Sequence, residues 1–121
     1  MKIIGLNHAN VTIPGGAEAE ARAFYCELLG LVELEKPASL QANGGLWLLA
    51  GMMPVHISVE DGVDRHKTRA HLAYEVDDLA AWQSRLEEAG FAVKPNTSFP
   101  GYTRVMLRDP FGNRVELIQA M

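Results

Sequence analysis

The sequence has one cysteine, no long apolar run and no cluster of basic residues, and each absence excludes a class of protein. Cys26 has no partner for an internal disulfide, and its place in a helical pattern favours a small core or half-buried residue over a catalytic thiol. No apolar stretch approaches the ~20 residues that cross a bilayer, and the N-terminal residues lead into a strand pattern rather than a signal peptide. We therefore expect a cytoplasmic protein.

The charge balance argues against nucleic acid and membrane surfaces as partners. The chain has 15 acidic and 11 basic side chains, a formal net charge of −4, and it lacks the basic patch that binds polyanions. Hydrophobic residues make up 48% and charged residues 21%, as in ordered globular proteins. A small molecule is the expected ligand.

The sequence repeats itself at an interval of about 60 residues. A shift of 60 superposes His56 on Glu116, and a shift of 63 superposes His8 on His71. Because 121 residues are too few for two independent domains of ordinary size, the two halves are expected to share one core.

The repeat divides the chain into two modules. We predict a single domain over 1–121, with module one at about 1–60, a polar linker at about 61–69 and module two at about 70–121.

Each half shows the pattern of a strand, a helix and about three further strands. Alternation predicts strands at about 3–13, 31–36, 39–43, 46–50, 54–60, 70–76, 91–94, 102–108 and 114–119. Helical spacing, followed by a glycine, predicts helices at about 17–28 and 79–89. The predicted fold class is α+β, with two βαβββ modules forming an open, curled mixed sheet around a trough and the helices outside.

Four potential metal ligands lie on the less apolar faces of these strands: His8, His56, His71 and Glu116. Repeated units are normally related by a pseudo-twofold axis, so repeat-equivalent positions are expected to converge near it. Three imidazoles and one carboxylate suit a divalent transition metal (Fe²⁺, Ni²⁺, Zn²⁺, Mn²⁺ or Co²⁺) better than Ca²⁺ or Mg²⁺, which prefer oxygen ligands. His66 lies in a charged loop and is expected at the surface.

Three other residues are candidates for contacts with substrate. Tyr102 and Arg104 follow a polar loop at 96–101, whose alternative interpretation is a solvated loop with one packed aromatic. Trp47 lies on a strand that flanks the trough, where it forms an apolar wall for substrate or belongs to the core.

These features resemble the vicinal oxygen chelate superfamily, which includes glyoxalase I, extradiol dioxygenases, fosfomycin-modifying thiol transferases, methylmalonyl-CoA epimerase and bleomycin-resistance binding proteins. The resemblance covers essentially the whole chain, and its most specific segment is 109–117, Asp-Pro-Phe-Gly-Asn-Arg-Val-Glu-Leu. It implies a βαβββ duplication that encloses a metal trough, with His8, His71 and Glu116 as ligands. Where glyoxalase I has glutamate or glutamine at the fourth position, this sequence has His56, which argues against plain glyoxalase I.

The resemblance also implies a mechanism, in which the metal chelates two neighbouring oxygens of the substrate and stabilises the charge that develops on them. The expected function is that of a metal-dependent lyase/isomerase or extradiol-type dioxygenase, with His56 and Glu116 as catalytic candidates. His56 either completes the metal shell or serves as a general base near neutral pH.

Two alternatives are a bleomycin-resistance-type protein, which binds a small molecule without catalysis, and a fosfomycin-type metal-dependent thiol transferase. The first has no use for aligned histidines. The second requires cations for a phosphonate, for which Lys94, Arg104 and Arg114 are candidates. Because related half-modules often complete their troughs across a dimer, we expect a homodimer, with 61–69 as the place for a swap between subunits.

Overall fold

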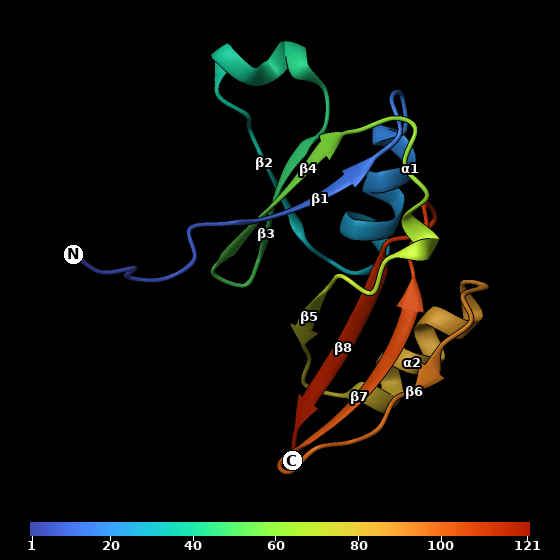
Figure 1. The fold of residues 1–121 in the computed structure, drawn as a ribbon. Coiled ribbons are helices and arrows are strands. Elements are labelled where there is room, and N and C mark those ends of the chain that lie inside the picture. The colour runs from blue at the N-terminus through green and yellow to red at the C-terminus, as the bar shows by residue number, and fades with distance from the viewer. The chain divides into compact units, whose positions relative to one another are not determined.

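The computed structural model describes all 121 residues, and its elements follow the order of two βαβββ units (Figure 1). Unit 1 comprises Met1–Val63 and unit 2 comprises Asp64–Met121. Each unit contains one four-stranded mixed sheet, with strand order β1-β4-β3-β2 in unit 1 and β5-β8-β7-β6 in unit 2. The predicted fold class, α+β with two βαβββ modules and open mixed sheets, is confirmed. No helix is long and apolar enough to cross a membrane.

Unit 1 contains four strands and three helical segments: β1 (Ala9–Ile13), α1 (Glu18–Arg22), the π-helical η1 (Ala23–Leu28), β2 (Val32–Leu34), the 3₁₀ helix η2 (Ala38–Asn43), β3 (Leu46–Ala50) and β4 (Met53–Val59). Strands β1 and β4 pair in parallel, whereas β3 is antiparallel to both β4 and β2. Alternate strand residues and one face of the helical segment are buried and form the core, namely Ile13, Leu46, Leu48, Val55, Ile57, Ala21, Phe24 and Tyr25.

The N-terminal strand is shorter than the alternation predicts. It was expected from residue 3, but β1 begins at Ala9, which lies opposite Val55. Its partner β4 begins only at Met53, so the residues before Ala9 have almost no strand to pair with. The side chain of Ile3 is accordingly 95% exposed.

Two other segments of unit 1 differ from the prediction. The strand expected at 39–43 is the 3₁₀ helix η2, because Pro37 fixes the turn before it and no neighbouring strand pairs with it. The helix expected at 17–28 changes from α to π geometry at Ala23.

Unit 2 contains four strands, a short 3₁₀ helix and one longer helix: η3 (Arg65–Lys67), β5 (His71–Glu75), α2 (Leu79–Glu88), β6 (Lys94–Pro95), β7 (Tyr102–Arg108) and β8 (Arg114–Ala120). The carboxylate of Asp78 caps α2 by accepting a hydrogen bond from the Ala81 N–H at 3.0 Å. The core lies between α2 and the sheet and contains Leu86, Val105, Leu107, Val115 and Leu117. The strand expected at 91–94 is reduced to the two residues of β6.

The internal repeat extends to the register of the strands. In unit 1 Asn10 of β1 lies opposite His56 of β4, and in unit 2 Ala73 of β5 lies opposite Glu116 of β8. His8 and His71 each come two residues before these positions. Each unit therefore places its two candidate ligands in the same register relation, although His8 lies one residue before β1 and His71 is the first residue of β5.

The turn between β7 and β8 is organised by Asp109, which is 4% exposed. Its Oδ1 accepts hydrogen bonds from the backbone N–H groups of Phe111 and Asn113 at 2.9 and 2.8 Å, and its Oδ2 accepts one from the Asn113 side-chain amide at 2.8 Å. This turn fixes where β8 begins and therefore where Glu116 lies along the strand.

Asp109→Ala is expected to lower the free energy of unfolding by about 3 kcal/mol, because a buried carboxylate with several N–H donors is lost. Urea denaturation followed by circular dichroism measures the loss. The control is Asp77→Ala, since Asp77 is exposed and has no hydrogen bond or ion pair. A similar, small effect of both substitutions would contradict this role of Asp109.

Candidate functional site

In unit 1 the rings of His8 and His56 stack face to face. Their centroids lie 4.1 Å apart and their planes differ by 21°. Trp47 lies opposite His56 on β3 and stacks on it at 4.1 Å, with planes only 3° apart. His56 is thus held between two rings, and this burial lowers its pKa, with a further decrease from the adjacent His8. Trp47, predicted at the wall of a trough, is half-buried on the same sheet face as His56.

The orientation of the His8 ring is set by its neighbour in sequence. Its Nδ1 lies 2.8 Å from Oδ1 of Asn7, which accepts the hydrogen bond. In the neutral ring this hydrogen bond places the proton on Nδ1 and leaves the lone pair on Nε2. Histidines that bind metals commonly have this arrangement.

In unit 2 the side chains of His71 and Glu116 meet directly. Nε2 of His71 lies 2.8 Å from Oε2 of Glu116, while Nδ1 of His71 lies 2.9 Å from the carbonyl oxygen of Arg69. A carbonyl oxygen only accepts, so Nδ1 carries a proton. Nε2 and Oε2 lie at hydrogen-bond distance from each other, and both atoms are of the kinds that donate lone pairs to a divalent transition metal.

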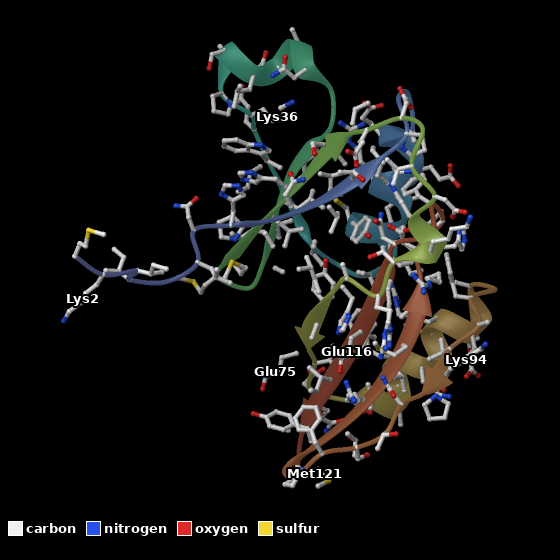
Figure 2. The ribbon with its side chains drawn as sticks, viewed as in Figure 1. Lys2, Lys36, Glu75, Lys94, Glu116 and Met121 are labelled. Atoms are coloured by element: carbon white, nitrogen blue, oxygen red, sulfur yellow. The ribbon has the colours of Figure 1, made fainter.

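Glu116 is buried, with 3% of its surface exposed, although it lies on the sheet face opposite the core (Figure 2). Its second oxygen, Oε1, accepts a hydrogen bond from Nη1 of Arg104 at 3.1 Å. Arg104 also donates from Nε to the Thr97 carbonyl oxygen at 2.9 Å, and its guanidinium lies 5.1 Å from the centroid of the Phe99 ring. Arg104, which the sequence suggested for substrate contact, is therefore also the residue that holds Glu116.

Tyr102 lies at the start of β7 with its ring 5.2 Å from that of Phe99, at an angle of 44°. The loop before it is bonded to β7, since the Asn96 N–H donates to the Arg104 carbonyl oxygen at 3.3 Å. In the structure Tyr102 thus packs on an aromatic residue of the adjacent loop.

The structure brings the four predicted ligands together as two pairs, His8 with His56 in unit 1 and His71 with Glu116 in unit 2. No group of three or more histidine, cysteine, aspartate or glutamate side chains is placed to hold a metal ion. The donor chemistry nevertheless fits a divalent transition metal, because both pairs include a histidine whose Nδ1 is bound to an oxygen and whose Nε2 is directed away from it.

Sequence reasoning missed the groups that orient these ligands. Asn7 and the carbonyl group of Arg69 each fix a histidine tautomer, and Arg104 fixes the Glu116 carboxylate. A backbone carbonyl has no side-chain signal at all. The position of Arg104 follows from the β7–β8 register, in which it lies opposite Ile118, two residues from Glu116.

The family model described as Glyoxalase/Bleomycin resistance protein/Dioxygenase superfamily matches residues 5–117. A glyoxalase family protein from Bacillus anthracis has a crystal structure that is 37% identical with a TM-score of 0.91, and the match covers 100% of this chain and 98% of that one. No curated protein matches the sequence.

Two more distant structures share the fold. TnmS3, an antibiotic binding protein from Streptomyces sp. CB03234, is 24% identical with a TM-score of 0.71, over 99% of this chain and 100% of that one. A variant of the fosfomycin resistance protein FosX from Listeria monocytogenes, in complex with Mn(II) and 1S,2S-dihydroxypropylphosphonic acid, is 18% identical with a TM-score of 0.81, over 99% and 95%.

Proposed function

Because the chain belongs to the glyoxalase/bleomycin resistance protein/dioxygenase superfamily, we propose that it is a divalent-metal-dependent enzyme that acts on a small molecule with vicinal oxygens. The observation that carries this proposal is the 2.8 Å approach of His71 Nε2 to Glu116 Oε2 while Nδ1 of His71 is bound to a carbonyl oxygen. Two neighbouring ligands of one octahedral ion, each bonded at about 2.0–2.2 Å, lie at a similar separation of about 3 Å.

In this proposal His8, His71 and Glu116 hold the metal. When bound, the ion supplies Lewis-acid stabilisation of the charge that develops on the two substrate oxygens. Arg104 keeps the Glu116 carboxylate in place by binding its other oxygen. The FosX structure supports the choice of substrate class, because its described ligand has two neighbouring hydroxyl groups and accompanies Mn(II).

His56 is the proposed general base. Ligand histidines direct an in-plane lone pair at a metal about 2.0–2.1 Å away, and two nearly parallel rings 4.1 Å apart do not direct both lone pairs at one point. His8 has its Nδ1 fixed by Asn7 and is the better ligand of the two. His56, held by Trp47, is left to accept a proton from the substrate at a ring nitrogen.

His56→Ala is therefore expected to retain its bound metal and to lower kcat by about 10²-fold or more, as loss of a general base does. Metal content and turnover are measured on the same preparation. His66→Ala is the matched control, because His66 lies exposed on η3. Loss of metal together with activity in His56→Ala would show that His56 is a ligand instead.

The experiment that tests the function begins with metal analysis of protein purified without a histidine tag. Catechols and hemithioacetals are then screened with Fe²⁺, Ni²⁺ and Zn²⁺, to distinguish dioxygenase from lyase/isomerase chemistry. We expect bound metal and turnover in one of the two substrate classes. Protein that neither retains an added metal nor turns over any of these substrates contradicts the proposal.

A second candidate function, sequestration of a small aromatic molecule without catalysis, is favoured by a separate observation. Trp47 and His56 stack with His8 and form a wall of parallel rings. TnmS3, which shares the fold, is described as an antibiotic binding protein. Tight binding of aromatic compounds by metal-free protein, unchanged when metal is added, would favour this function over the first.

We also propose that residues 1–121 form one domain, with modules at about 1–60 and 70–121 and a linker at about 61–69, and that two copies associate as a homodimer. The homodimer is supported by the exposed apolar surface near the N-terminus, where Ile3, Ile4 and Leu6 are 95%, 98% and 80% exposed. Sedimentation analysis is expected to show a species of twice the chain mass of 13.3 kDa. A purely monomeric protein at micromolar concentration would contradict this assembly.

A further inference from the structure

Three nitrogen-bearing side chains form a row across the sheet of unit 2, next to Glu116. Arg114 of β8 lies opposite His71 of β5 on one side and opposite Arg108 of β7 on the other. Residues that lie opposite each other project from the same face of a sheet, so this row shares its face with Glu116, two residues further along β8. Like charges directly opposite on neighbouring strands repel, and the row contains no carboxylate.

The arginines on this face differ in what they bind. Arg108 donates from Nη1 to three backbone carbonyl oxygens of the linker and the β7–β8 turn, at 3.1 to 3.4 Å. Arg104 pairs with Glu116. Arg114 is half-buried in the sheet and has no hydrogen bond or ion pair. Its guanidinium is therefore free to bind a ligand.

Positive charge exceeds negative charge on the whole face. The register places Lys94 and three arginines on it, against the two carboxylates of Glu75 and Glu116, and Figure 2 labels Lys94, Glu75 and Glu116. One of these carboxylates, Glu116, is already bound by Arg104 and His71. A divalent ion held by His71 and Glu116 would add to this excess, so the face favours an anion beside the metal.

We propose that Arg114 binds an oxyanion group of the substrate, a carboxylate or a phosphate-type group, next to the vicinal oxygens that chelate the metal. A guanidinium presents two parallel N–H donors that match the two oxygens of such a group. The inference rests on the proposed function and narrows its substrates to anionic molecules with vicinal oxygens. It assigns to Arg114 a specificity role that does not depend on the contacts that hold Glu116.

The first arm of the test uses metal-free protein and inorganic phosphate at low ionic strength, where charge screening is weak. Amide chemical shifts of β8 follow the titration. Wild-type protein is expected to show saturable binding, and Arg114→Met is expected to bind phosphate at least about tenfold more weakly, since a charge-assisted interaction is lost. Lys67→Met removes the same charge from a side chain that is 84% exposed, and is expected to bind phosphate like the wild type. Equal binding by wild-type and Arg114→Met protein overturns the inference.

The second arm uses Zn²⁺-loaded protein and two diphenols that differ by one carboxylate, catechol and 3,4-dihydroxybenzoate, in anaerobic calorimetric titrations. We expect wild-type protein to prefer the carboxylate by at least about tenfold, Arg114→Lys to retain only part of this preference, and Arg114→Met to lose it. Equal wild-type affinities for the two diphenols overturn the inference and leave the proposed function standing. Failure of both diphenols to bind Zn²⁺-loaded protein contradicts the proposed function itself.

Discussion

His71→Ala is expected to lower the affinity of the protein for Zn²⁺ by more than about 100-fold. Changes to groups that only orient a ligand cost 10- to 100-fold, so loss of a ligand itself lies above that range. The substitution removes the nitrogen that lies 2.8 Å from the Glu116 carboxylate and leaves that carboxylate with Arg104 alone. Competition with a chromogenic chelator at neutral pH measures the affinity.

The control for this prediction is His66→Ala. His66 has an exposed ring 3.7 Å from the carboxylate of Asp64, and its loss is expected to leave the affinity for Zn²⁺ unchanged. Circular dichroism establishes that both variants are folded. If folded His71→Ala binds Zn²⁺ as tightly as wild-type protein, His71 is not a ligand, and the proposed metal site is wrong.

Gly45→Ala is expected to cost about 4 kcal/mol or more of folding free energy, or to prevent folding. Gly45 has φ +79°, and a Cβ at this position would lie 2.1 Å from the backbone carbonyl oxygen of Ile57 on β4. The backbone must shift to accept it, which also disturbs the hydrogen bond from the Gly45 N–H to the Glu18 carboxylate at 3.2 Å. That hydrogen bond lowers the pKa of Glu18. A loss of this size is exceptional for one methyl group and identifies a steric cause.

Gly30→Ala is a closely matched control, because Gly30 has the same φ of +79° and no atom within 4 Å of an added Cβ. Only the unfavourable left-handed backbone remains, for which about 1–2 kcal/mol is expected. Urea denaturation of the two variants, followed by circular dichroism, separates the steric from the conformational contribution. Equal losses in Gly45→Ala and Gly30→Ala would contradict the close packing of Gly45 on β4.

Local sequence patterns were sufficient to predict a helix or strand where that element depends mainly on its own residues. The strand β7 was predicted at 102–108 and β3 at 46–50, with the bounds that the structure has, because each alternates between core and solvent and ends at turn-forming residues. The helix α2 was predicted because Asp78 caps it and Gly90, with φ +93°, follows it.

Local patterns failed where a strand needs a partner from elsewhere in the chain. Residues 3–8 alternate as well as those of β1, but β4 is too short to pair with them. Residues 39–43 were also predicted as a strand, and they form a 3₁₀ helix because no strand lies beside them. Pairing in a sheet is a long-range property that propensity does not contain.

The candidate site was likewise predictable only where local patterns determine it. The repeat and the alternation predicted that His71 and Glu116 share a sheet face, and the structure brings them to 2.8 Å. The contact between Arg104 and Glu116 depends on the register that the β7–β8 turn imposes, which the sequence alone did not reveal.

The stack of Trp47 on His56 has a practical consequence for experiments. An indole in parallel contact with an imidazole changes its fluorescence when that ring gains charge or moves. Emission from Trp47 therefore reports on events at His56 without an added dye, and the second tryptophan, Trp82, lies on α2. A Trp82→Phe protein would turn the chain into a single-tryptophan sensor of its own chemistry.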